Sequence, residues 1–236
     1  MNATQENPKH KTIALRWLIR ETVGNLFLVA ILFGIVGRWD WWNGWALAVI
    51  YLLMTLGTII FILPVNPRML AERSRPKAGF KNWDFLLVST IGVCMLAAYI
   101  LSCLDVRFGW SPQVPLGLEI AALVICILGY DVLLVWSMVV NAFFTLVIRI
   151  QTDRHHTVVT DGPYRWVRHP GYLATILSYV FTPLLLGSLW GLLPAGIAGI
   201  LLVVRTGLED KTLQAELPGY QEYTRQTRYR LIPGIW

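Results

Sequence analysis

The chain has 236 residues, of which 56% are hydrophobic and only 14% are charged, and its mean hydropathy is +0.55. Because about a quarter of the residues in soluble domains are charged, this composition excludes an ordinary soluble protein and indicates an integral membrane protein. The net charge of +6 does not indicate a nucleic-acid partner, because Lys and Arg lie at the ends of apolar runs rather than on one long polar face.

The first segment, residues 1–21, is polar and basic with Trp17 in it, and it predicts a short interfacial helix before the membrane. The apolar run 23–37 is short for a bilayer core of about 30 Å, so flanking residues from about 20 to 38 are expected to complete a first span. No small-residue cleavage pattern follows this run, so we expect it to remain as a helix rather than to be removed as a signal peptide.

Four tryptophans then cluster at positions 39, 41, 42 and 45, which is typical of a headgroup belt, with ligand binding as the alternative. A second span is predicted over 45–63, before Pro64, followed by a basic loop over 65–84. A third span covers 85–104. The fourth apolar stretch, 118–148, would extend roughly 46 Å as one helix and should tilt, kink or protrude. Its polar residues Asp131 and Asn141 either form helix–helix hydrogen bonds or have a functional role.

The last apolar stretch, residues 173–204, is interrupted by Pro183 and by the turn formers at 187–191, so it predicts two helices in a hairpin. If the spans alternate, 18 of the 20 Lys and Arg residues fall on one face, which leaves only Arg38 and Arg107 opposite. By the positive-inside rule that face is cytosolic, together with both termini. The predicted fold is an all-α, multi-pass helical bundle in the membrane.

Polar residues gather most densely at positions 156–172, HTVVTDGPYRWVRHPGY. A loop whose cations meet lipid phosphates would explain the arginines alone. A zinc site built from His155, His156 and His169 is not expected, because adjacent histidines seldom point to one metal and no Cys or carboxylate set completes four ligands. A second polar cluster, RTGLED at 205–210, places Arg205 and Glu209 on one helical face, where they could simply pair. The hairpin brings it to the same membrane face.

Together, HTVVTDGPYRWVRHPGY, the Arg-x-x-x-Glu pair and the closing GYQEYTRQTRYRLIPG make the region from about 141 to 234 resemble the isoprenylcysteine carboxyl methyltransferase family, relatives of the phospholipid N-methyltransferases. The resemblance implies an S-adenosylmethionine-dependent transferase with a cytosolic-facing cofactor pocket in its C-terminal half. Cofactor contacts then fall on Gln151, His156, Thr157, Val158, Val159, Tyr164, His169, Pro170, Gly171, Tyr172 and Glu209. Arg205 falls where the family has a substrate-orienting arginine, and Asp210 replaces a second glutamate.

These residue types suit the implied chemistry. A carboxylate such as Glu209 can hold the cofactor's ammonium, and His169 or backbone donors can meet its carboxylate. Tyr164 and Tyr172 can line the adenine or the sulfonium. A carboxylate acceptor is already ionised at neutral pH and needs a positioning cation, which is Arg205, whereas an amine acceptor would need a base, Glu209 or Asp210.

The chain therefore divides into membrane spans of unassigned function over 1–140 and a methyltransferase region over 141–236 with a helical hairpin at 172–205. The expected acceptor is a lipid-like or prenylated carboxylate such as isoprenylcysteine, reached from the bilayer. The alternatives are N-methylation of a phospholipid amine, S-methylation of a small thiol, or a membrane protein that binds a ligand without catalysis.

Overall fold

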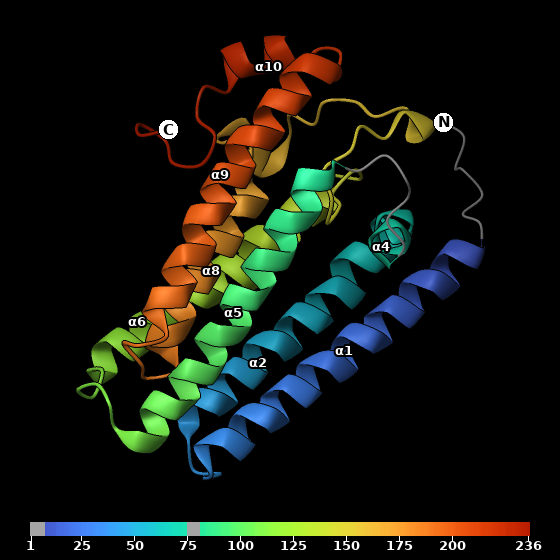
Figure 1. Cartoon of the computed structure of the whole chain (residues 1–236). Coiled ribbons are helices and arrows are strands. Elements are labelled where there is room, and N and C mark those ends of the chain that lie inside the picture. Colours follow the sequence, from blue (N-terminus) through green and yellow to red (C-terminus); the bar gives the residue numbers. More distant parts are fainter. Residues whose placement is uncertain (1–7, 75–80) are drawn as a thin grey trace.

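A computed structural model of the chain describes residues 8–74 and 81–236. Within these ranges all regular structure is helical, which confirms the predicted all-α class. Five stretches are long and apolar enough to cross a membrane, and they run from Thr12 to Val36, Trp42 to Val65, Asn82 to Phe108, Leu116 to Val140 and Leu192 to Glu216. The described part of the chain thus has the architecture of an integral membrane helical bundle (Figure 1).

The first helix, α1 (Pro8–Val36), is continuous, so the separate interfacial helix predicted over 1–21 is wrong for the described residues. The physical reason lies in the spacing of Ala14, Trp17 and Leu18, which recur on one helical face and are buried against the rest of the bundle. This packing extends the apolar span towards the N-terminus as one helix.

The second span consists of α2 (Trp42–Gly57), the π-helical segment η1 (Thr58–Ile62) and α3 (Leu63–Val65). The tryptophans around the beginning of α2 differ in their exposure to solvent. Trp39 and Trp45 are exposed, as a headgroup belt requires, but Trp41 is only 1% exposed and packs edge-on against Phe33 in the core. The belt prediction therefore fails for Trp41.

The fourth span is built from α6 (Leu116–Cys126), the π-helical η2 (Ile127–Leu134) and α7 (Val135–Val140), after α5 (Asn82–Phe108). It ends at Asn141, so the predicted continuation to residue 148 is wrong. A glycine lets η2 approach α8 closely, because a Cβ on Gly129 would lie 3.0 Å from both the carbonyl oxygen of Ala174 and the hydroxyl of Ser178.

The last helices are α8 (Pro170–Leu185), α9 (Leu192–Glu216) and the short α10 (Tyr220–Gln226). The turn between α8 and α9 is held by Asp105 of α5, whose carboxylate accepts hydrogen bonds from the Ser188 hydroxyl at 2.6 Å and from the backbone N–H groups of Leu189 and Trp190. The beginnings of α1 and α5, the loop 141–169 and α10 lie at one end of the bundle, and the turns α1–α2, α5–α6 and α8–α9 lie at the other (Figure 1).

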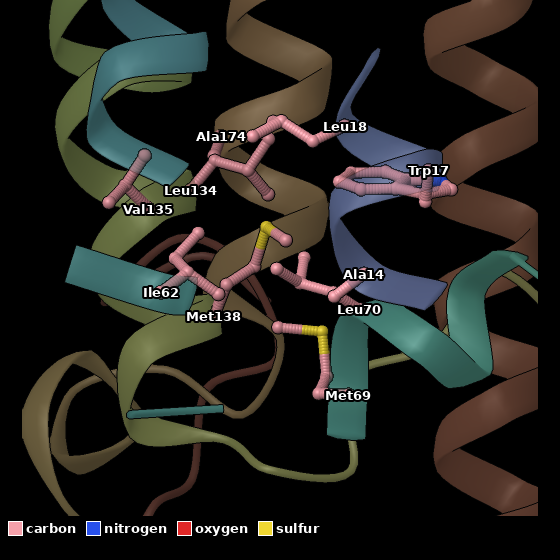
Figure 2. Close-up of a cluster of buried hydrophobic side chains, with 10 residues drawn as sticks. All are labelled: Ala14, Trp17, Leu18, Ile62, Met69, Leu70, Leu134, Val135, Met138 and Ala174. Carbon is pink, nitrogen blue, oxygen red and sulfur yellow. The ribbon is translucent and has the colours of Figure 1, made fainter. Parts of the chain in front are cut away.

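A short helix, α4 (Pro67–Ser74), is seated at the end of the bundle that carries the loop 141–169 (Figure 1). Its Met69 and Leu70 are completely buried, and Figure 2 shows them among side chains from α1, η1, η2, α7 and α8. The whole cluster comprises Ala14, Trp17, Leu18, Ile62, Met69, Leu70, Leu134, Val135, Met138 and Ala174. Packing of this kind fixes α4, and with it the side chain of Arg73, relative to the spans.

Candidate active site

A cavity of about 370 Å³ opens where the loop 141–169 meets α5, α8 and α9. At one end it is lined by polar and aromatic side chains of the loop and the tail, and at the other by apolar side chains of the spans, including Ile91, Leu134 and Leu202. Its volume lies in the range typical of small-molecule sites, about 300–1,000 Å³. The cavity thus joins the polar end of the bundle to its membrane-embedded part.

The segment after α7 lines this cavity as irregular backbone. Asn141 ends the helix, since its Oδ1 accepts a hydrogen bond from the backbone N–H of Phe143 at 2.8 Å, while its Nδ2 donates to the Tyr164 hydroxyl at 3.0 Å. Asn141 therefore has a positioning role, which settles one alternative left open by the sequence. Asp131 differs: both of its carboxylate oxygens are enclosed and have no hydrogen-bond partner among the described residues.

Backbone groups of this segment are satisfied by side chains from distant parts of the chain, as buried irregular backbone requires. The N–H of Ile148 donates to Asp84 at 2.7 Å, and the carbonyl of Leu146 accepts from Arg205 at 2.6 Å. The carbonyl of Phe143 accepts from the Gln151 amide at 2.6 Å. These contacts replace the helical hydrogen bonds that residues 141–148 would otherwise make.

Arg205 of α9 is held by Asp84 of α5 rather than by Glu209. Its Nε and Nη2 atoms donate to the two Asp84 oxygens at 2.6 and 3.1 Å, and both side chains are buried. The guanidinium also lies 5.2 Å from the centre of the Tyr172 ring. Arg205 therefore does not pair with Glu209. Its charge is matched by Asp84, which lies 121 positions away in the sequence.

Glu209 instead accepts a short hydrogen bond from the Tyr172 hydroxyl through its Oε2 atom. Its Oε1 atom makes no hydrogen bond within the described residues. The ring of Tyr172 follows Gly171, where a Cβ would lie 2.5 Å from the Phe144 ring, so only glycine fits this part of the wall without displacing it. Phe144, Gly171, Tyr172 and Glu209 are thus neighbours along one side of the cavity.

Asp210 lies fully buried behind this wall. It accepts hydrogen bonds of 2.7–3.2 Å from Arg168 and His169 before α8, from Gln214 in α9, and from Tyr220 and Arg230 in the tail. Since an ionised carboxylate only accepts, Nε2 of His169 must carry the proton in this contact. Asp210 is therefore a structural hub, which answers the question that the sequence left about its role.

Arg168 extends the same network into the tail. Its Nη1 donates to the carbonyl oxygens of Thr227 and Arg228 at 2.9 and 2.7 Å, and its backbone N–H donates to the carbonyl of Tyr229 at 2.9 Å. The tail thereby completes the wall that carries Tyr220 and Tyr223, two aromatic lining residues whose places the sequence did not predict.

His156 lies against the Phe143 ring, with the two ring centres 4.4 Å apart, and its Nδ1 accepts a hydrogen bond from the backbone N–H of Gln151 at 3.3 Å. Burial, with the nearby cations of Arg154 and Arg149, lowers the pKa of His156 to about 4. At neutral pH the ring is therefore uncharged, with its proton on Nε2.

Of the residues that the family resemblance assigned to the site, most line the cavity and two do not. Gln151 is fully buried and joins Phe143 to Arg154, and Pro170 opens α8. The residues brought together are His156, Thr157, Val158, Val159, Tyr164, His169, Gly171, Tyr172, Arg205 and Glu209. The sequence did not single out Asp84, Phe144 or Arg73, because no local motif signals side chains that meet only in three dimensions.

Residues 122–215 match the model of the isoprenylcysteine carboxyl methyltransferase (ICMT) family. This part of the chain is similar to that family. The ICMT match runs from α6 to the end of α9 and includes each cavity-lining position that the resemblance assigned, but it stops before α10 and the tail. A comparison with curated proteins gives no match. Together, the ICMT region and the apolar helices indicate a membrane methyltransferase.

Replacing Asp210 with Ala is expected to lower the free energy of unfolding by about 3–5 kcal/mol, because it leaves the buried Arg168 guanidinium without its carboxylate. Thermal denaturation in detergent would measure this change. The matched control is Asp161→Ala, which removes the partner of Arg165 in an exposed pair and should cost about 0–1 kcal/mol. Equal melting temperatures for the two variants would contradict the role of Asp210 as a hub.

The stability of the protein should depend on the protonation of His156. Its folded-state pKa of about 4 lies below the ordinary value of 6.5, so between these two values the unfolded chain binds more protons and the folded state loses stability as the pH falls. Denaturation curves between pH 7 and pH 4 should show a smaller acid-induced loss for His156→Gln than for the wild type. The same slope in both proteins would mean that His156 titrates normally when folded.

Proposed function

We propose that the protein is a membrane methyltransferase that uses S-adenosylmethionine and methylates the carboxylate of a lipid-like acceptor such as isoprenylcysteine. The observation that carries the proposal is a single cavity in which the ICMT-type lining residues meet apolar side chains of the membrane spans. An amphiphilic acceptor could keep its tail among the spans while its head reaches the polar end. We propose further that the polar end faces the cytosol.

The lining residues fit the cofactor in charge and shape. Glu209 keeps Oε1 without a partner and could receive an ammonium group, while neutral His156 offers Nε2–H to a carboxylate. This assignment replaces His169, whose Nε2 already donates to Asp210. The rings of Tyr164, Tyr220 and Tyr223 supply aromatic surface beside these polar groups. When bound, S-adenosylmethionine supplies a methyl group on a positively charged sulfur.

The protein's own part in the transfer is alignment and exclusion of water. Arg205 is rigid, because Asp84 and the Leu146 carbonyl hold it from two sides, and such a fixed cation can orient an anionic head. A carboxylate acceptor needs no base at neutral pH, since its ordinary pKa is about 4. Asp210 is unsuited to act as the base for an amine, because five residues already donate to it.

In this proposal the two halves of the chain form different sides of the cavity. Residues 141–236 supply the cofactor side of the cavity, and residues 1–140 contribute Arg73 and apolar lining such as Ile91 on the acceptor side. Asp84 acts indirectly, because it holds the lining residue Arg205. We propose that this division determines which acceptor is methylated.

The acceptor class is tested by incubating the protein in lipid nanodiscs with labelled S-adenosylmethionine and, in parallel, farnesylcysteine, phosphatidylethanolamine and a small thiol. We expect label only in farnesylcysteine, in a base-labile ester. Label only in the amine or only in the thiol would replace the carboxylate proposal by that alternative. Cofactor binding without transfer to any acceptor would favour a ligand-binding protein without catalysis.

Glu209→Gln is expected to weaken S-adenosylmethionine binding about tenfold or more, since a hydrogen bond to a charged group contributes about 1.5–3 kcal/mol. Calorimetry in detergent measures the affinity. Glu216→Gln is a matched control on the same helix, because Glu216 pairs with Lys81 away from the cavity lining. An unchanged affinity in Glu209→Gln, or an equal loss in the control, would show that Glu209 does not hold the cofactor.

A further inference from the structure

One arginine in the cavity makes no ion pair with any residue that the structure describes. Four arginines line the cavity, and three of them are held by carboxylates in the pairs Arg149–Glu72, Arg168–Asp210 and Arg205–Asp84. Arg73 of α4 makes no ion pair with any described residue, and its Nε and Nη1 atoms are enclosed without a hydrogen-bond partner. An unpaired, enclosed cation is costly for a folded protein, so its position calls for a ligand that offers the missing acceptors.

The fold holds Arg73 in place by packing alone. Met69 and Leu70, one turn earlier in α4, are completely buried in the cluster of Figure 2. The guanidinium carbon then lies 5.8 Å from the centre of the Trp17 ring and 5.5 Å from that of Phe144. Aromatic faces stabilise a cation, but they leave its N–H donors unsatisfied. The side chain is therefore preorganised for an acceptor of hydrogen bonds.

Arg73 adjoins the proposed cofactor wall through Phe144. Its neighbour Phe144 packs on Gly171, and the next residue, Tyr172, carries Arg205 over its ring. Burial lowers the pKa of Arg73, and the charge of Arg205 acts in the same direction, whereas Tyr130 and Glu21 act against it. A bound anion would relieve the two lowering effects.

The surroundings of this cation suit an amphiphile. Tyr130 and Tyr179 line the main cavity and also a second cavity of about 130 Å³ between the spans, so the two cavities share these side chains as a common wall. Val88, Ile91 and Leu134 add apolar surface on the same side. A ligand with one anionic head and a long apolar tail matches this combination.

We propose that Arg73 receives the carboxylate of the methyl acceptor, so that a helix outside the ICMT-matched region selects an acceptor with an anionic head. This inference rests on the proposed function and adds a recognition residue to it. Arg205, neutralised by Asp84, aligns the head, whereas Arg73 supplies the uncompensated charge that distinguishes an acid from a neutral analogue. Arg73 is thus a specificity-determining residue supplied by the first half of the chain.

The test compares equilibrium binding of N-acetyl-S-farnesylcysteine with that of its primary carboxamide, which has nearly the same shape and no charge, to the full-length protein in phosphatidylcholine nanodiscs. We expect the wild type to bind the acid about tenfold more tightly or better. Arg73→Gln should lose this preference while it keeps its affinity for the amide and for S-adenosylmethionine. Arg68→Gln, an exposed arginine on the same helix, should keep the preference.

Three outcomes would overturn the proposal. Equal binding of acid and amide to the wild type would show that no anionic head is recognised. A loss of S-adenosylmethionine affinity in Arg73→Gln, with the acid preference kept, would assign Arg73 to the cofactor. Displacement of the labelled acid by phosphatidic acid at lower concentrations than by the unlabelled acid would assign Arg73 to a lipid phosphate. Because the readout is binding, a wild type that prefers the acid but transfers no methyl group would refute the proposed catalysis and leave the recognition site standing.

A second variant separates recognition from structure. Arg73→Met keeps the packing against Trp17 and Phe144 and removes the unpaired charge, so its melting temperature should equal or exceed that of the wild type while the acid preference disappears. A clear drop in melting temperature together with weaker binding of both acid and amide would mean that Arg73 serves the packing of α4 instead.

Discussion

The paired charges of Asp84 and Arg205 connect the parts of the molecule on which the cavity depends. Each group is buried, and each also binds backbone of the segment between α7 and α8. Irregular backbone at this depth is tolerated only when its polar groups find partners. The pair therefore does two things at once: it joins α5 to α9, and it allows residues 141–148 to line a cavity instead of continuing a helix.

This arrangement explains why the first half of the chain belongs to the site although the family match begins only at residue 122. Arg73 of α4 lines the cavity beside residues of the matched region, and Asp84 of α5 holds Arg205, which also lines it. Charges from both halves of the chain are thus matched at the boundary of the cavity.

The sequence predicted the helical membrane fold from its apolar runs, and most of the residues that the resemblance assigned to the site line the cavity. The predictions from sequence failed where contacts in the folded protein determine the local structure. The apolar residues 142–148 predict a helix, but side chains such as Asp84, Arg205 and Gln151 bind the backbone of this segment in its irregular conformation. The partner of Arg205 lies 121 positions away, beyond the reach of any helical spacing. The lack of a partner for Arg73 is likewise a property of the folded packing alone.

The tail that docks on Arg168 and His169 has a consequence for the order of biosynthesis. Residues 227–230 give their carbonyl groups to Arg168 and His169, and Tyr220 and Arg230 donate to Asp210. These segments follow α9 in the chain, so they leave the ribosome after all the spans have been made. The cavity wall is therefore closed last, and a nascent chain already integrated into the bilayer still lacks a finished pocket until its tail has folded back onto α8 and α9.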